Sequence, residues 1–199
     1  MFPKIADFLR ILSLRDRYYP NSKYLNILFE QFEQNFNSSS LDIGCGLDPK
    51  NPFKASKIMG LDLNCIEERN VIAGDLSSGH LPFSDSQFNF VTAFDVLEHV
   101  PRVSLNNSNT VFPFINLMSE IHRILKPEGI FFASTPCFPF KEVFQDPTHV
   151  NIMTEETLRD YFCNDCWATI YGFKGKFKII KTGWLKKRHF AFLMKVERN

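Results

Sequence analysis

The chain has 199 residues, of which 44% are hydrophobic and 23% charged, and its formal net charge is +1. This length suits one well-buried domain, and this composition excludes a disordered or fibrous protein. With so little net charge, the protein has no overall field that would draw nucleic acid or an anionic membrane. No stretch approaches the roughly 20 apolar residues of a membrane helix, so we expect a single domain over residues 1–199 that does not bind membranes.

Cysteine usage indicates a reducing compartment. The chain has five cysteines, an odd number at irregular spacing, and its amphipathic first residues do not resemble a secretory leader. We therefore expect free thiols and a cytoplasmic protein.

Hydrophobic periodicity predicts two helices ahead of the core. Apolar residues recur at helical spacing over 5–12 and 25–32. We expect these helices to form an N-terminal cap over residues 1–37, which ends at the polar breaker of residues 37–40.

From residue 38 onward, short apolar runs alternate with amphipathic stretches, which indicates a doubly wound α/β sheet. A buried helix is predicted at 114–125, and a second one begins at 154–157 after a loop rich in Pro and Phe. Strands are predicted at 40–43, 57–61, 71–73, 88–94, 129–134, 177–182 and 190–196.

The strongest local signal is the run Leu41-Asp42-Ile43-Gly44-Cys45-Gly46. A buried strand here ends in a Gly-x-Gly turn, whose backbone N–H groups can approach a ligand without a Cβ in the way. In a doubly wound sheet, ligands bind at the carboxyl ends of the strands. The turn therefore favours a nucleoside cofactor, although dinucleotides and plain tight turns use the same pattern.

Acidic residues follow three successive strands and strengthen this interpretation. Besides Asp42, they are Asp62 at the end of the second strand and Asp75 after the third. A carboxylate at Asp62 can accept two hydrogen bonds from a ribose diol, and Asp75 can accept one from the adenine amine. Helix caps and turns also favour Asp, but they explain three such positions less readily than one.

These stretches resemble the class I S-adenosylmethionine-dependent methyltransferases, in particular the small "type 11" methyltransferase-domain group. The run Phe94-Asp95-Val96-Leu97-Glu98-His99-Val100 is especially characteristic. The resemblance implies a Rossmann-like, mostly parallel seven-stranded sheet with an antiparallel C-terminal strand. It further implies a cofactor-binding half over 38–136 and an acceptor loop, helix and strands over 137–199. The matching stretches are 41–46, 60–62, 74–76, 81–83, 88–100 and 125–136.

The resemblance also implies S-adenosylmethionine as cofactor, with S-adenosylhomocysteine as product. Asp42 would lie near the methionine amino group or its water, and Asp62 would bind the ribose hydroxyls. Leu63 would pack on adenine, while Asp75 and the Leu76 backbone N–H would contact the adenine edge. The remaining implied cofactor contacts, made mainly by backbone, are Gly44, Cys45, Gly46, Phe94 and Asp95.

Three substitutions and one irregular connection depart from the family pattern. Asp48 replaces a third glycine, and Glu128 replaces the first glycine of the usual Lys-Pro-Gly-Gly. Asn89 replaces an acid. Two prolines between Gly46 and Ile58 predict that the first crossover helix is short or broken.

Two histidines are candidates for proton transfer. His99 follows the fourth strand, and His149 lies in the loop after the fifth, within Asp146-Pro147-Thr148-His149. A neutral His149 imidazole oriented by Asp146 would suit a general base near neutral pH. His99 at a helix start and His149 in a polar cluster could equally have structural roles. Their spacing with Asp146 does not support a metal site, so we expect no metal.

The leading hypothesis is a methyltransferase acting on a small molecule, with the oxygen of a sugar or related metabolite as the expected acceptor atom. The alternatives are an RNA or protein methyltransferase that uses the basic C-terminal segment, and a non-catalytic cofactor-binding module. In that segment the lysines are expected to be solvated while Phe177, Ile179 and Ile180 pack inward. An NAD-dependent dehydrogenase is weaker, because the Gly-x-x-Gly continuation is missing.

Overall fold

The computed structural model of the protein describes residues 29, 32, 37–65, 67–185 and 189–198. The two helices expected in the N-terminal cap, at 5–12 and 25–32, lie outside the described residues apart from Phe29 and Phe32.

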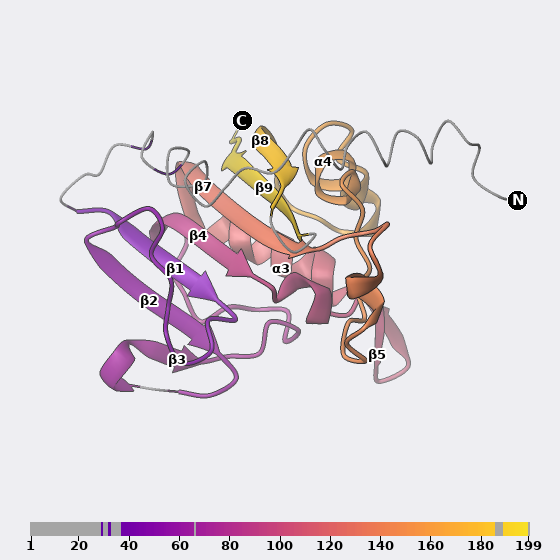
Figure 1. The fold of residues 1–199 in the computed structure, drawn as a ribbon, viewed down its shortest axis with the longest axis horizontal. Coiled ribbons are helices and arrows are strands. Elements are labelled where there is room, and N and C mark those ends of the chain that lie inside the picture. Colours follow the sequence, from indigo (N-terminus) through magenta and orange to yellow (C-terminus); the bar gives the residue numbers. More distant parts are fainter. Residues whose placement is uncertain (1–28, 30–31, 33–36, 66, 186–188, 199) are drawn as a thin grey trace, which may run out of the picture.

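A seven-stranded sheet with the order β3-β2-β1-β4-β7-β9-β8 organises the chain (Figure 1). The first five strands in this order are parallel, and β9 runs antiparallel to both of its neighbours. The predicted fold class is therefore confirmed, including the antiparallel C-terminal strand. The strands are β1 (Ser39–Ile43), β2 (Lys57–Asp62), β3 (Val71–Ala73), β4 (Phe88–Phe94), β7 (Leu125–Pro136), β8 (Phe177–Trp184) and β9 (His189–Val196).

Two α-helices are described, and both pack on the core. Helix α3 (Pro113–Ile124) buries eight of its twelve residues, and α4 (Thr157–Phe162) buries Leu158 and Phe162. Short 3₁₀ segments are η1 (Glu67–Arg69), η2 (Leu97–His99), η3 (Lys141–Phe144) and η4 (Trp167–Tyr171). Among the described residues, no helix is long and apolar enough to cross a bilayer.

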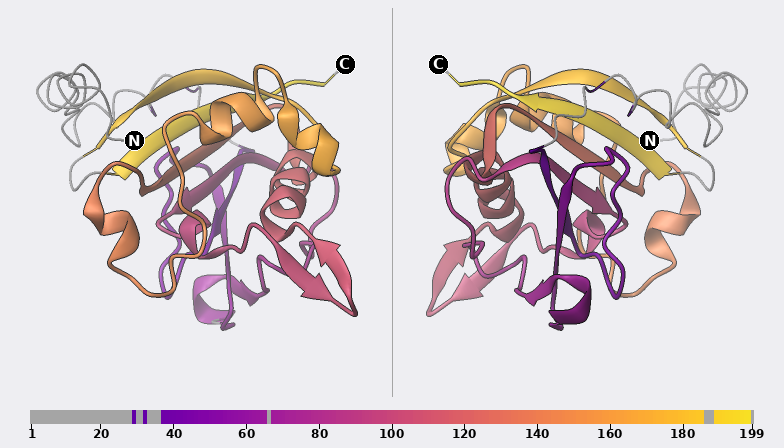
Figure 2. Two further views of the ribbon diagram at one scale, coloured as in Figure 1. Left: turned by 90° about the vertical axis from the view of Figure 1, so that its right-hand side faces the viewer. Right: turned by 90° about the vertical axis from the view of Figure 1, so that its left-hand side faces the viewer.

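The hairpin of β5 (Ser104–Asn106) and β6 (Asn109–Val111) was not expected from the sequence. It projects from the body of the protein (Figure 2). Its turn residues Asn107 and Ser108 both have positive φ, as a two-residue hairpin turn requires. Because the hairpin is exposed on both sides, its sequence lacks the apolar alternation that marks a strand.

The crossover between β1 and β2 contains no helix, as its two prolines predict. Phe53 from this loop takes the place of a helix against the sheet. Its ring stacks on Phe90 of β4, with centroids 4.4 Å apart, and meets Phe29 edge-on at 4.9 Å. Phe132 of β7 completes this second core, which accounts for part of the high phenylalanine content.

The edge strand β8 differs from its expected packing. Phe177 is buried, but Ile180 is 40% exposed, so the expectation that Ile179 and Ile180 both face inward is wrong. Adjacent residues of a strand point to opposite faces, so Ile180 lies on the exposed face opposite to that of Phe177 and Ile179.

Candidate functional site

The carboxyl ends of the parallel strands bring the predicted cofactor residues to one edge of the sheet. Gly44, with φ +63°, follows β1 and touches the segment after β4. A Cβ built on Gly44 would stand 2.2 Å from Val96 Cγ2, whereas one built on Gly46 would meet nothing within 4 Å. The turn is therefore closely packed at Gly44 and open at Gly46, which leaves room for a ligand to approach the backbone.

Asp62 links the ends of β1 and β2. Its Oδ2 accepts a hydrogen bond from the Gly46 N–H at 2.8 Å, and its Oδ1 accepts one from the Leu63 N–H, also at 2.8 Å. The carboxylate is half-buried, and each oxygen keeps a further lone pair. It can therefore still accept hydrogen bonds from a diol.

The other predicted nucleoside contacts lie close by. Leu63 is 72% exposed, so a ring packed on it would shield apolar surface. Asp75 is exposed, and its Oδ1 accepts the Ser77 N–H at 2.7 Å, while Leu76 is buried. The Cys45 side chain turns back toward Gly60 of β2, and burial raises the pKa of its thiol to about 11. Only the backbone of Cys45 is thus suited to a ligand.

Asp42 is 1% exposed, and its carboxylate points into the protein. Its Oδ1 accepts a hydrogen bond from the Thr92 hydroxyl at 2.6 Å, and its Oδ2 accepts one from the Lys50 backbone N–H at 2.8 Å. Burial raises the pKa of Asp42 to about 6, although both hydrogen bonds and the Lys50 charge oppose that shift. Asp42 therefore anchors the crossover loop to β4, and its contact with the methionine part stays a prediction.

Stability should depend on pH through Asp42. Its folded pKa of about 6 lies above the unfolded value of 3.8, so the folded state holds the proton more tightly. The free energy of unfolding should therefore fall by roughly 2–3 kcal/mol as pH rises from 4 to 7. Urea unfolding at several pH values should show this slope in the wild type and in the exposed control Asp48→Asn, and a clearly smaller slope in Asp42→Asn, where the raised pKa of Glu98 still contributes. An unchanged slope in Asp42→Asn would contradict the assignment.

The predicted methionine end contains a cation that the sequence motifs did not indicate. The Lys50 ammonium stands over the half-buried Phe94 ring, 4.5 Å from its centroid. Asp95 follows with φ +53°, and its Oδ1 lies 3.1 Å from His189 Nε2. Lys50 belongs to the irregular crossover loop, where no periodicity or spacing relates it to Phe94.

His99 and His149 meet although 49 residues separate them. Their rings are perpendicular, with centroids 4.9 Å apart. His149 Nδ1 lies 3.0 Å from the Val143 carbonyl oxygen, which can only accept, so Nδ1 of His149 carries the proton. In a neutral imidazole, Nε2 of His149 then keeps its lone pair.

Asp146 does not orient His149, contrary to the expectation from the sequence. Its Oδ1 accepts hydrogen bonds from the Thr148 backbone N–H and hydroxyl, at 2.8 and 2.6 Å. Because the Thr148 hydroxyl proton is used there, its oxygen accepts a hydrogen bond from His99 Nδ1 at 2.9 Å. Asp146 therefore orients His99 through Thr148, since the Asx-type turn at 146–148 directs its carboxylate to its own loop.

The loop that carries His149 is fastened to η2 by its backbone. The N–H groups of Val150 and Asn151 both donate to the Glu98 carbonyl oxygen at 2.9 Å. The Asn151 amide donates to the Leu97 carbonyl oxygen at 3.0 Å, and its Oδ1 accepts Arg102 Nε at 2.6 Å. Asn151 is fully buried, whereas Arg102 is exposed and its position was not singled out from the sequence.

Glu98 lies beneath the two histidines and is 1% exposed. Its Oε2 accepts the Thr135 hydroxyl at 2.9 Å, and burial is the main reason that its pKa is raised. One carboxylate oxygen of Glu98 and one ring nitrogen from each of His99 and His149 lie within 4.8 Å of one another.

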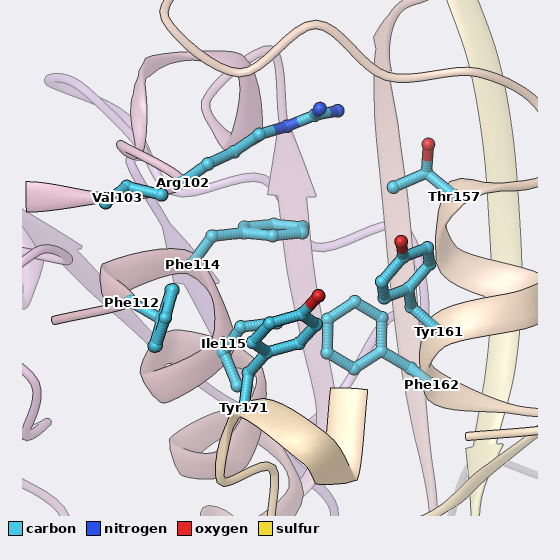
Figure 3. A pocket seen from close by; sticks show the side chains of 9 residues that line it. All are labelled: Arg102, Val103, Phe112, Phe114, Ile115, Thr157, Tyr161, Phe162 and Tyr171. Atoms are coloured by element: carbon cyan, nitrogen blue, oxygen red, sulfur yellow. The ribbon is translucent and has the colours of Figure 1, made fainter. Parts of the chain in front are cut away.

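A pocket of about 240 Å³ lies between α3, the β5 end of the hairpin and α4 (Figure 3). Aromatic rings form most of its wall, and the polar groups of Arg102, Thr157, Tyr161 and Tyr171 also line it. Arg102 connects it to the histidine loop, because its guanidinium also donates to the Ile152 carbonyl oxygen. The remaining lining residues are Val103, Phe112, Phe114, Ile115 and Phe162.

Comparisons with known proteins agree with this fold. An uncharacterized protein of Methanocaldococcus jannaschii is 31% identical over 113 residues, which are 53% of this chain and 44% of that protein. This chain thus spans less than half the length of that relative. A SAM-dependent methyltransferase from Aquifex aeolicus has a similar fold, with a TM-score of 0.56, 11% identity and coverage of 87% and 89% of the two chains. The [4+2]-cyclase SpnF has a TM-score of 0.60, 15% identity and coverage of 92% and 86%.

The sequence profile of a family described as "Methyltransferase domain" matches residues 13–164. That match covers the glycine turn, the strand-end acids and the histidine loop. The chain therefore belongs to the methyltransferase-domain family of class I methyltransferases, whose cofactor is S-adenosylmethionine.

Proposed function

We propose that the chain is an enzyme that methylates a hydroxyl oxygen of a small molecule, such as a sugar or a related metabolite. The observation that carries this proposal is the His99–His149 pair, which lies after β4 and β7 with Nδ1 of each ring engaged as a donor. The pair follows Phe94 and Asp95, which the family resemblance assigns to the methionine end of the cofactor.

S-Adenosylmethionine supplies an activated methyl group when bound. The residues of this chain must orient the acceptor and take up the hydroxyl proton. Nε2 of His149 has a lone pair for that proton, and the Val143 carbonyl holds the ring in place. The His99 ring is held in the same way by Thr148 and Asp146.

The aromatic pocket supports a small acceptor. Pockets for small molecules combine apolar walls with a few placed polar groups, and this one offers one guanidinium and three hydroxyl groups. Such a lining suits a molecule with both apolar faces and hydroxyl groups, as a sugar has.

The proposal predicts that His149→Ala keeps its cofactor affinity but loses turnover. We expect roughly 100-fold slower methyl transfer, measured as S-adenosylhomocysteine release with a panel of sugars, nucleotide-linked sugars and phenols. The exposed His80, paired with Glu120 away from the loop, provides the control His80→Ala, which should behave as wild type. Unchanged turnover in His149→Ala would remove its assigned role, and methylation of RNA but not of the panel would overturn the proposed acceptor.

A further inference from the structure

We propose that Glu98, His99 and His149 form a binding site for a divalent first-row transition-metal ion such as Zn²⁺, placed to activate the acceptor hydroxyl. The inference rests on the proposed function for the role of the metal, but not for its binding. It departs from the expectation of no metal, because the third ligand is Glu98 and not Asp146.

The donor set is the first argument. Two imidazoles and one carboxylate are the protein ligands of many catalytic metal sites, which leave at least one position open. Nitrogen donors favour Zn²⁺, Co²⁺ or Ni²⁺ over Mg²⁺, which prefers oxygen ligands. The three ligand atoms lie within 4.8 Å of one another. Ligand atoms at 2.0–2.1 Å from a tetrahedral metal ion lie about 3.3 Å from one another. Side-chain rotations must therefore bring the three ligand atoms closer together when an ion binds.

The second argument is the state of the two rings. Metal-binding histidines usually donate their other ring N–H to a carbonyl or carboxylate, which fixes the tautomer. His149 Nδ1 donates to the Val143 carbonyl oxygen, and His99 Nδ1 donates to Thr148, whose hydroxyl in turn donates to Asp146. Both rings are thus held with Nε2 unprotonated, which is the form that binds a metal.

The third argument is charge. Glu98 is a buried carboxylate, and an uncompensated buried charge is costly. In the part of the chain that the structure describes, no Lys, Arg or His nitrogen forms an ion pair with Glu98. Among the described residues, its side-chain hydrogen-bond partner is the neutral Thr135 hydroxyl. A divalent ion between Glu98 and the rings would supply the missing positive charge.

The position of the three ligands indicates what a bound metal ion would do. The backbone bonds from Val150 and Asn151 to the Glu98 carbonyl hold the His149 loop against η2 whether or not an ion is bound. A hydroxyl bound at the open position loses its proton to solvent water, because coordination lowers the pKa of a bound O–H group by several units. The O–H bond breaks, its electron pair stays on the metal-bound oxygen, and the metal does not change oxidation state. In the metal-bound form the imidazoles thus act through the ion and not as bases.

The test is metal binding by the full chain after EDTA treatment and dialysis. Calorimetric titration with Zn²⁺, and with Co²⁺ followed by its visible absorption, should give one equivalent of tight binding. Glu98→Gln, His99→Ala and His149→Ala should each weaken that binding at least 10-fold. Thr148→Val, which removes the hydroxyl that links Asp146 to His99, should weaken it about 10-fold. His80→Ala should bind as wild type. S-Adenosylhomocysteine affinity, measured on each variant, verifies that it is folded.

Retention of the tight equivalent in the double variant His99→Ala/His149→Ala would overturn the site, because the ion would then be bound elsewhere, for example by thiols. Absence of tight binding in the wild type would overturn it as well. If the EDTA-treated protein methylates a hydroxyl acceptor as fast as the Zn²⁺-loaded protein, the metal inference fails while the proposed function stands. If one ion binds at these residues but no hydroxyl acceptor is methylated, the site stands and the proposed function fails.

Discussion

Gly44→Ala should destabilise the protein by about 3 kcal/mol or more, whereas Gly46→Ala should cost only about 1 kcal/mol. Both glycines have φ near +60°, so both variants carry the same backbone penalty. They differ in space, because a Cβ on Gly44 would stand 2.2 Å from Val96 Cγ2 and 2.6 Å from Val96 Cβ, while one on Gly46 meets nothing within 4 Å. Urea unfolding of the two variants measures the difference.

A second substitution isolates the collision. Val96→Gly removes the three atoms nearest to the new Cβ. The double variant Gly44→Ala/Val96→Gly should therefore be at least 1 kcal/mol more stable than the summed effects of the two single substitutions predict. If Gly44→Ala is no less stable than Gly46→Ala, the segments after β1 and β4 do not pack as described. Additivity in the double variant would lead to the same conclusion.

Most strands of the large sheet could be predicted because they are buried apolar runs that end in a turn residue, whereas the exposed strands β5 and β6 could not. β1 and β4 were located to within one residue at each end, since their flanks change sharply from apolar to polar. The start of β7 at Leu125 was missed, because the Lys126-Pro127 that ends α3 also lies in the first residues of the strand. Glu128 has φ +63° there, where the family has glycine, and its carboxylate pairs with Lys195 Nζ at 2.5 Å.

The candidate site also contains one part that the sequence predicts and one part that it does not. Glycines and acids at strand ends are found by local spacing, which is why Gly46 and Asp62 could be singled out before their hydrogen bond was seen. The histidine site depends on contacts between η2 and a loop about 50 residues later, such as the Asn151 amide to the Leu97 carbonyl. No local pattern encodes these contacts. That is also why the sequence paired His149 with its neighbour Asp146, although Asp146 supports His99.

Fold likeness alone does not decide the chemistry. The cyclase SpnF and the Aquifex aeolicus methyltransferase have similar TM-scores against this chain, 0.60 and 0.56. Function therefore has to be argued from the site. The roles assigned to the nucleoside end and to the acceptor end of the site can be tested separately. Cofactor binding at the nucleoside end can be measured without knowing the acceptor.

Asp62→Asn should weaken S-adenosylhomocysteine binding about 100-fold or more. A carboxylate bound to a ribose diol makes two charge-assisted hydrogen bonds, each worth roughly 1.5–3 kcal/mol. The substitution also turns an amide N–H toward the Gly46 or Leu63 N–H, which now donate to the carboxylate at 2.8 Å. Calorimetry gives the dissociation constant, and Asp48→Asn, an exposed acid two residues beyond Gly46, is the matched control that should bind as wild type.

The 2′-deoxy analogue of S-adenosylhomocysteine separates ribose binding from disturbance of the turn. The wild type should bind the analogue about 10-fold more weakly than the parent compound, because one carboxylate–hydroxyl bond is lost. Asp62→Asn should bind both ligands with nearly equal affinity, since the partner of that hydroxyl is already weakened. If the variant discriminates between the two ligands as strongly as the wild type does, Asp62 supports only the turn. The ribose must then be held by another group at the end of β2.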